Sequence, residues 1–241
     1  MRPSHEWISR INQKQKQLAE FERSEEQCKN IERWTEIEFV YSTLVLEGCG
    51  LSREDVSRLA SSQATEAANE SDRQASALLE SFRRVMRLAE QRGKNASLSP
   101  ELLLELHNLP DAAAGLRQQA GRNSTAPPPE RLQAAVESAC HWFTAESFTE
   151  FHPVEQASLV LLRLIDIEPF DRSNERTALV AASLFTLRSE LPPVIIKPEM
   201  KAAYRAACAE AMRMNTKPMV DLLAAAVEKS ITDVMEAMIK N

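Results

Sequence analysis

The charged side chains most able to do chemistry gather in residues 167–179, whose sequence is IEPFDRSNERTAL. Three carboxylates, those of Glu168, Asp171 and Glu175, alternate here with the guanidinium groups of Arg172 and Arg176. Such groups could bind an anion or nucleotide, or they could pair with one another in an ordinary helix–loop–helix. The carboxylate at position 168 could also serve as a base, although an ordinary carboxylate is a weak one.

Two apolar stretches flank this segment and must position it. Apolar residues recur at three- and four-residue steps on both sides, which predicts helices over 153–166 and 174–189. The same periodicity predicts helices over 130–148, 198–213 and 216–239, and an N-terminal helical run from Ser4 to about Val45. Ser52 and Ser99 are candidate N-caps, and Pro100 fits the first position of the helix that follows Ser99.

Residues 110–130 form the longest break in this helical pattern. They contain Gly115, Gly121 and the run Pro127-Pro128-Pro129, residue types that end helices and form turns. We expect a structured loop or a short hairpin here.

Composition narrows the class of protein. Only 5 of the 241 residues are Gly, while Ala, Leu, Glu and Arg abound, and this composition favours helices. The net charge of −6 argues against binding of nucleic acid. The four cysteines lack CxxC spacing, so a zinc site is not expected. The N-terminal stretch is polar and no run reaches about 20 apolar residues, so we expect a cytoplasmic protein that does not span a membrane.

Segment 168–179 resembles the signature of the Fic family: His-Pro-Phe, any residue, Asp or Glu, Gly-Asn-Gly-Arg, two residues, Arg. His152-Pro153-Val154-Glu155-Gln156-Ala157 resembles the start of the helix that leads into this motif, and Gly115-Leu116-Arg117 resembles the family's substrate-docking flap. Lys201 to Tyr204, followed by Asn215 to Leu223, resembles the closing helices. The resemblance implies an all-α Fic/Fido-like domain with a central helix–loop–helix, a short flap hairpin and an N-terminal helical extension.

In that family the His is a general base, the acidic residue binds Mg²⁺, the Gly-Asn-Gly turn cradles phosphates and two arginines clamp them. Here the base position is Glu168, the metal position is Arg172, and the glycines are Ser173 and Glu175. Asn174 and Arg176 are retained as candidate nucleotide or anion ligands. The second arginine is Leu179, Asp171 lies one place before the metal position, and Phe170 matches as a core anchor.

Thr43-Leu44-Val45-Leu46-Glu47-Gly48 resembles the family's inhibitory-helix motif, in which a glutamate pairs with the second motif arginine. Leu179 cannot form that pair. Glu47 is expected to meet Arg172 or Arg176, or to face solvent. Of the remaining candidates, His107 and His152 are expected to be structural or surface residues, and His141-Trp142-Phe143 to pack in or near the core.

The resemblance predicts an N-terminal extension over 1–95 and a Fic-like domain over 96–241, packed as one unit. The first hypothesis for function is a binding or regulatory pseudoenzyme, with no intact catalytic residue, no metal, and a protein or peptide docked at the flap (Gly115, Arg117). The second is a diverged nucleotidyl or phosphoryl transferase that uses Glu168 and Arg176, which alone would require ATP and Mg²⁺. The sequence leaves the oligomeric state open.

Overall fold

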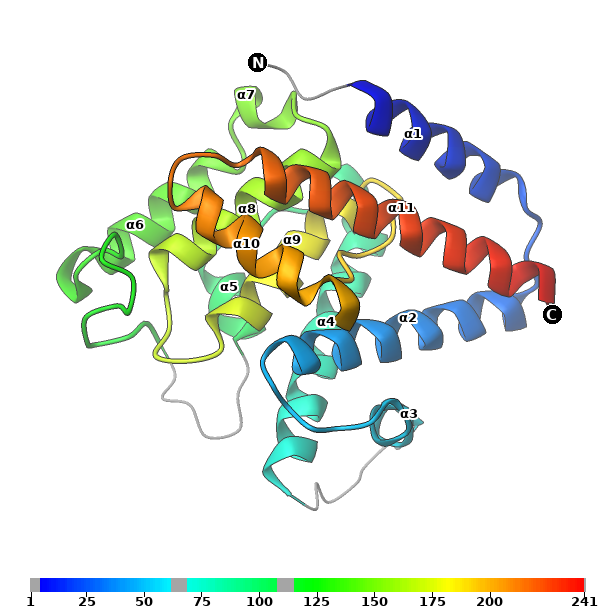
Figure 1. Ribbon diagram of the computed structural model, residues 1–241, viewed down its shortest axis with the longest axis horizontal. Coiled ribbons are helices and arrows are strands. Elements are labelled where there is room, and N and C mark those ends of the chain that lie inside the picture. The colour runs from blue at the N-terminus through cyan, green and yellow to red at the C-terminus, as the bar shows by residue number, and fades with distance from the viewer. Residues whose placement is uncertain (1–4, 62–68, 108–114, 241) are drawn as a thin grey trace. The chain divides into compact units, whose positions relative to one another are not determined.

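The computed structural model describes residues 5–61, 69–107 and 115–240. Within these ranges the chain is helical and no residue forms a strand, so the predicted all-α class is confirmed (Figure 1). In chain order the elements are α1 (His5–Glu20), α2 (Glu25–Leu46), α3 (Arg53–Ser61), α4 (Glu70–Arg92), the 3-10 turn η1 (Gly93–Asn95), α5 (Pro100–Leu106), α6 (Pro129–Trp142), α7 (Glu146–Thr149), α8 (Pro153–Ile167), α9 (Asn174–Leu187), the 3-10 turn η2 (Pro198–Met200), α10 (Lys201–Ala211) and α11 (Lys217–Lys240).

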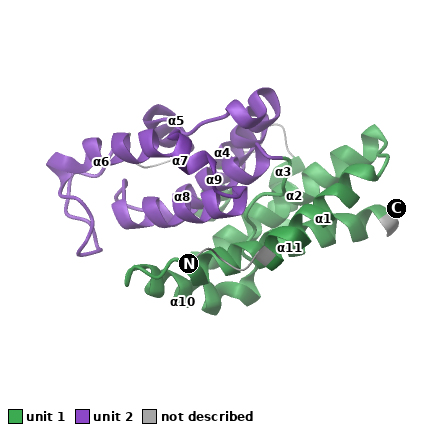
Figure 2. Ribbon diagram, turned by 90° about the horizontal axis from the view of Figure 1, so that it is seen from above, with its two compact units in different colours: residues 1–76, 190–241 green, residues 77–189 purple. Residues whose placement is uncertain are grey.

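The chain divides into two compact units (Figure 2). Unit 1 comprises Met1–Ser76 and Glu190–Asn241, and unit 2 comprises Ala77–Ser189. This division differs from the predicted boundary between residues 95 and 96. The reason is that α1 and α2 pack on α11, so the two ends of the sequence share one core.

Unit 1 is organised around α11. The α1 residues Arg10 and Lys14 form ion pairs with Glu228 of α11 at 3.2 and 3.1 Å. Ile11, Leu223 and Val227 are fully buried, and they supply the apolar contact between elements that the sequence separates by about the whole chain. Burial of these apolar side chains stabilises unit 1 more than the two ion pairs do, because partly exposed ion pairs contribute little to the free energy of folding.

Unit 2 is organised around the pair α8 and α9. Every residue of α9 from Arg176 to Thr186 is buried, because α5 covers it as well as α8. A helix that is apolar on all sides in this way belongs at the centre of a core. The turn that joins α8 to α9 therefore leads directly into a buried helix, and this turn carries the motif of residues 168–176.

Several local expectations are met in detail. Ser99 Oγ accepts a hydrogen bond from Leu102 N at 3.1 Å, with Pro100 at the first helical position. Ser52 and Asp55 exchange backbone-to-side-chain bonds, both of 3.1 Å, which caps the start of α3. The predicted N-terminal run is broken instead at residues 21–24, where Ser24 forms a capping box with Gln27 and starts α2.

The short flap hairpin is not formed in the described part of that segment, residues 115–128, which consists of turns and bends. Three consecutive prolines, of which Pro127 and Pro128 fall in this range, lack the N–H groups that a ladder requires. Residues 108–114 lie outside the described residues. Residues 115–128 are called the flap below.

None of the helices in the described ranges is long and apolar enough to cross a bilayer. Cys28, Cys49, Cys140 and Cys208 are free thiols.

Candidate functional site

The turn between α8 and α9 has two residues in left-handed backbone conformation, and neither is glycine. Glu168 ends α8 with φ 46°, and Ser173 precedes α9 with φ 58°. Left-handed φ is costly for residues that carry a Cβ, so the surrounding contacts must hold the turn in place. Position 173, which is glycine in the Fic signature, thus keeps the backbone conformation that a glycine favours.

Asn174 closes this turn with its own side chain. Its Oδ1 accepts a hydrogen bond from Phe170 N at 2.8 Å, and its Nδ2 donates to Phe170 O at 2.7 Å. One amide side chain therefore satisfies both backbone groups of the residue four positions earlier. Asn174 is committed to the shape of the loop, whatever else it contacts.

Arg117 fastens the flap to the turn. It is 3% exposed, and its backbone N–H donates to Pro169 O at 2.9 Å. Its guanidinium donates to the backbone oxygens of Glu168 and Gln119 at 2.6 and 2.5 Å. The same group also reaches Pro127 O at 2.5 Å, so one buried cation holds both ends of the flap against the end of α8.

The carboxylate of Glu168 is turned toward the flap. Its Oε2 accepts hydrogen bonds from the backbone N–H groups of Arg122 and Asn123 at 2.6 and 3.1 Å. Two neighbouring N–H groups that converge on one carboxylate oxygen form a small anion-binding nest. The position of the family's general base thus carries an acceptor that is bound to backbone.

Close approach of the flap to α8 depends on Gly121. A Cβ at this position would lie 2.5 Å from the Cβ of Ala126 and 2.7 Å from Oε2 of Glu168. Further along the flap, Asn123 Nδ2 donates to Ile165 O at 3.1 Å and Thr125 Oγ1 to Asp166 Oδ1 at 2.8 Å. The flap is therefore tied along the whole last turn of α8.

His107, at the end of α5, also lies against the turn. Its ring stacks on Phe170 with centroids 3.6 Å apart and an angle of 2° between the planes, and its Nδ1 lies 3.0 Å from Thr177 Oγ1. Thr177 Oγ1 donates to Ser173 O at 3.0 Å, so its single hydrogen is used and the imidazole Nδ1–H must be the donor. Burial, together with the positive charges of Arg176 and Arg172, lowers the pKa of His107 to about 4.

The sequence predicts a structural role for His107, and the stacking agrees with that role while placing it beside the motif. No signal in the sequence connects position 107 with position 170, because the contact depends on how α5 packs against α9. Arg117 is a similar case, since its sequence identifies it only as a flap residue.

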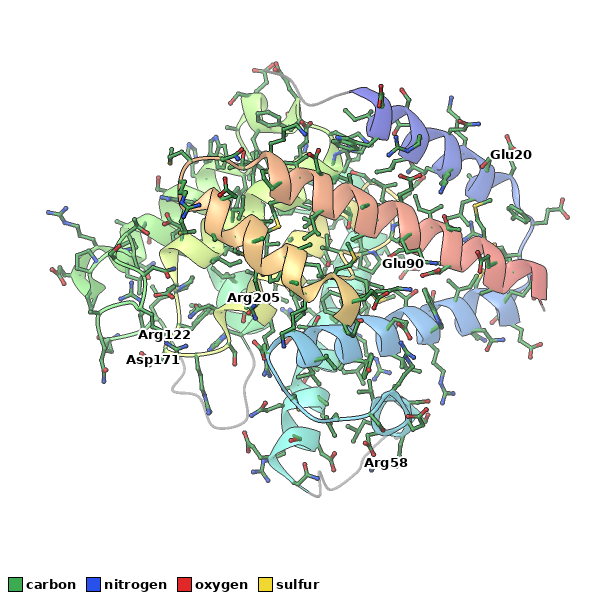
Figure 3. The ribbon with its side chains drawn as sticks, viewed as in Figure 1. Glu20, Arg58, Glu90, Arg122, Asp171 and Arg205 are labelled. Carbon is green, nitrogen blue, oxygen red and sulfur yellow. The ribbon has the colours of Figure 1, made fainter. Side chains whose placement is uncertain are left out.

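The other motif side chains diverge in exposure. Asp171 and Arg172 are exposed, whereas Arg176 is buried and Leu179 lies in the core, 1% exposed. In Figure 3 the side chains of Arg122 and Asp171, from the flap and the turn, lie in the same part of the view. The family's motif positions are therefore distributed over a surface, a turn and a helix core.

These residues do not fit the Mg²⁺ that the family uses. The metal-ligand position is the cation Arg172, and Glu168 already accepts two backbone N–H groups. Among the described residues no group of three His, Cys, Asp or Glu side chains lies close enough to hold a metal ion.

The segment that resembles an inhibitory helix ends α2 in unit 1. Thr43 is buried, and Gly48 has φ 87°. Cys49 N donates to Leu44 O at 2.9 Å and Gly48 N to Val45 O at 3.1 Å, the pattern of a Schellman cap. From α10, Lys201 and Arg205 donate to the carbonyls of Val45 and Leu46 at 3.0 and 3.1 Å, where the helix dipole favours positive charge.

Comparison with known proteins identifies the fold and shows a similarity of one segment to a known family. Residues 97–186 match the model of the Fic/DOC family. The chain is 32% identical over 110 residues to protein adenylyltransferase fic-1 of Caenorhabditis elegans, covering 46% of this chain and 22% of that protein. It is 30% identical over 105 residues to protein adenylyltransferase Fic of Drosophila grimshawi, again covering 22% of the relative. The chain thus matches about a fifth of the length of these curated relatives.

Two solved structures share the fold over nearly the whole chain. Fic-1 from C. elegans superposes with a TM-score of 0.85 at 23% identity, covering 98% of this chain and 73% of that one. A Fic domain containing signaling protein from Bacteroides thetaiotaomicron superposes with a TM-score of 0.84 at 20% identity, covering 96% and 97%. Residues 97–186, which carry the motif turn and the flap, are thus similar to the Fic/DOC family, and the chain shares the fold of these two Fic structures over nearly its whole length.

Proposed function

We propose that this chain is a binding or regulatory pseudoenzyme of the Fic/DOC family, which docks a protein or peptide at the flap and does not transfer AMP. The observation that carries the proposal is the position of the Glu168 carboxylate. It stands where the family has its base, and it accepts the N–H groups of Arg122 and Asn123. To take a proton from an incoming hydroxyl, this oxygen would have to give up bonds that hold the flap.

Three further substitutions support the loss of phosphate chemistry. Arg172 places a positive charge where the family binds Mg²⁺. Glu175 places a negative charge at the start of α9, beside the helix N-terminus that would receive a phosphate. Leu179 is buried in apolar surroundings, so it cannot replace an arginine that contacts phosphate.

The flap itself supports a docking role. Arg117, Glu168 and Asn123 hold its backbone in one conformation, so a partner would not have to order it on binding. Gln118, Gln119 and Ala120 are exposed next to this anchored part. A peptide could pair with the exposed backbone there, as in recognition by strand addition.

The alternative is a diverged nucleotidyl or phosphoryl transferase. Two observations favour it: Asn174 and Arg176 are retained, and the curated relatives that match this chain are named protein adenylyltransferases. In that case Arg176 would bind phosphate and Glu168 would have to leave the flap. Because the match covers 22% of those relatives, their activity comes to this chain only as a hypothesis.

Calorimetric titration of the purified chain with Mg·ATP separates the two. We expect no binding at millimolar nucleotide. Binding at micromolar concentration that is lost in Arg176→Ala and kept in Arg172→Ala would overturn the pseudoenzyme proposal. Because Arg176 is buried, thermal unfolding of the Arg176→Ala variant must first establish that it is folded. Arg172→Ala is the matched control, since that arginine is exposed on the same turn.

Docking at the flap needs its own test. Hydrogen exchange of the flap amides should slow when a cognate partner binds, and Gln119→Pro should weaken that partner by removing an exposed N–H. Unchanged exchange in the presence of a bound partner would place the docking surface elsewhere.

A further inference from the structure

A second surface feature of unit 2 lies at the end of α6. Trp142 is 38% exposed and Phe151 is 42% exposed, although the sequence predicts Trp142 in or near the core. Both rings meet the buried ring of Phe148 edge-on, with centroids 4.9 and 6.3 Å away. The two exposed rings thus pack on opposite or adjoining edges of one buried aromatic neighbour.

The stretch of sequence that carries these two rings contains glutamates but neither lysine nor arginine. Between Arg131 and Arg163 the chain has four glutamates and neither lysine nor arginine. Three of the four, Glu137, Glu146 and Glu150, are exposed. His152 adds no compensating charge at neutral pH, because burial lowers its pKa to about 4.

The side chain of Arg188, the residue that directly follows α9, points toward the interior of unit 2. Arg188 donates to Ala96 O and to Gln156 Oε1, both at 2.6 Å, and its guanidinium lies 4.2 Å from the centroid of the buried Phe185 ring. These contacts place its charge against the interior of unit 2. The exposed residues Trp142, Glu146, Glu150 and Phe151 are called the aromatic–acidic patch below, and its two charged side chains are both carboxylates.

An aromatic face and a carboxylate attract the same chemical group. The face of a tryptophan ring binds a guanidinium or ammonium, and a carboxylate pairs with it through charge-assisted hydrogen bonds. Glu146 follows Trp142 by four residues and Glu150 directly precedes Phe151, so both kinds of group lie within one stretch of ten residues. Anionic partners such as nucleic acid or an acidic lipid surface would be repelled.

We infer that the aromatic–acidic patch binds a segment of a partner protein that presents arginine or lysine next to an apolar side chain. The patch is separate from the flap: the flap precedes the first turn of α6, whereas Trp142 ends this helix of 14 residues. At 1.5 Å per residue the two surfaces lie about 20 Å apart along the helix. The inference therefore does not depend on the proposed function of the flap.

Selection from a random peptide library displayed on phage tests this inference with the full chain as the target. The selection is run in parallel against the Trp142→Ala/Glu146→Gln/Glu150→Gln variant. We expect peptides enriched in arginine or lysine beside leucine, isoleucine or phenylalanine, recovered on the unaltered chain and lost on the variant. Peptides recovered equally on both, or without basic residues, would overturn the inference.

Fluorescence anisotropy with the most enriched peptide then measures each contribution. Trp142→Ala alone, and Glu146→Gln with Glu150→Gln, should each weaken binding about fivefold, and added salt should weaken it further. The matched control is Phe21→Ala with Glu22→Gln, an exposed aromatic–acidic pair in unit 1. An equal loss in this control would mean non-specific attraction to a protein of net charge −6 and would overturn the assignment of the patch.

Discussion

The α8–α9 turn and the end of α2 preserve different parts of their family motifs. In the turn, several side chains differ from the Fic signature that the segment resembles, while Arg117, Glu168 and Asn174 hold the backbone through hydrogen bonds. At the end of α2, Thr43, Glu47 and Gly48 resemble the inhibitory motif, while position 179, where the resemblance places the arginine that pairs with the glutamate, is leucine. Backbone shape and side-chain chemistry therefore vary separately: the turn keeps its shape with other side chains, and the end of α2 keeps its motif-like residues although position 179 is leucine.

From this comparison we predict that hydrogen bonds of buried side chains stabilise the turn, whereas backbone conformation stabilises the end of α2. Arg117→Ala would leave the carbonyl oxygens of Glu168, Gln119 and Pro127 without their donor in a buried place. We expect a loss of about 4 kcal/mol in the free energy of unfolding, measured by urea denaturation. Arg122→Ala is the matched control, because only the backbone of Arg122 contacts Glu168, and it should change stability by less than about 0.5 kcal/mol. Similar losses in both variants would contradict the role of Arg117.

A pH dependence should arise from His107, which packs against the same turn. Its pKa is about 4 in the folded chain and about 6.5 when unfolded, so the unfolded chain takes up the proton first as pH falls. The stability that the neutral ring contributes is complete above about pH 6.5, decreases between pH 6.5 and pH 4, and decreases no further below pH 4. At 1.36 kcal/mol per pKa unit the loss is about 3 kcal/mol.

His152 has the same direction of shift, so the two histidines must be separated. The free energy of unfolding, measured by denaturation at several pH values in this range, should depend less on pH in His107→Gln and in His152→Gln. Each variant should lose part of the total dependence. Chemical shifts of the Phe170 and Thr177 signals should follow only the protonation of His107. A His107→Gln variant with the slope of the unaltered chain would refute the buried neutral ring.

At the end of α2 the critical residue is Gly48, because its φ is 87°. Gly48→Ala should cost about 1 kcal/mol through backbone strain alone, since no atom lies within 4 Å of the added Cβ. Gly50 has equally open surroundings without the left-handed φ, so Gly50→Ala is the matched control and should be neutral or slightly stabilising. Equal thermal shifts for the two variants would argue against a Schellman cap.

Sequence periodicity predicted the helices well because their apolar faces are regular, and Ser52 and Ser99 identified two helix starts. It missed the break at residues 21–24, where Ser24 starts a new helix with a capping box, and the break between Trp142 and Glu146 inside the helix predicted over 130–148. It expected a structured loop or a short hairpin over residues 110–130, because this stretch contains turn-forming glycines and prolines. The contacts of Arg117 with Pro127 and of His107 with Phe170 join positions far apart in sequence, so local pattern carries no signal for them.

The substitution with the smallest expected effect, at Glu168, is also the most informative one. Glu168→Gln keeps the length of the side chain and an oxygen that can accept from Arg122 N and Asn123 N, but removes the negative charge. If the carboxylate serves to hydrogen-bond the flap, the free energy of unfolding should fall by under about 1 kcal/mol, which is the difference between a charged and a neutral acceptor. Faster amide exchange at positions 122 and 123, with α9 unaffected, would locate that loss. Asp171→Asn, on the exposed side of the same turn, should change neither quantity. Stabilisation by Glu168→Gln would instead indicate a carboxylate held there at a cost, as expected of a group kept for chemistry rather than for structure.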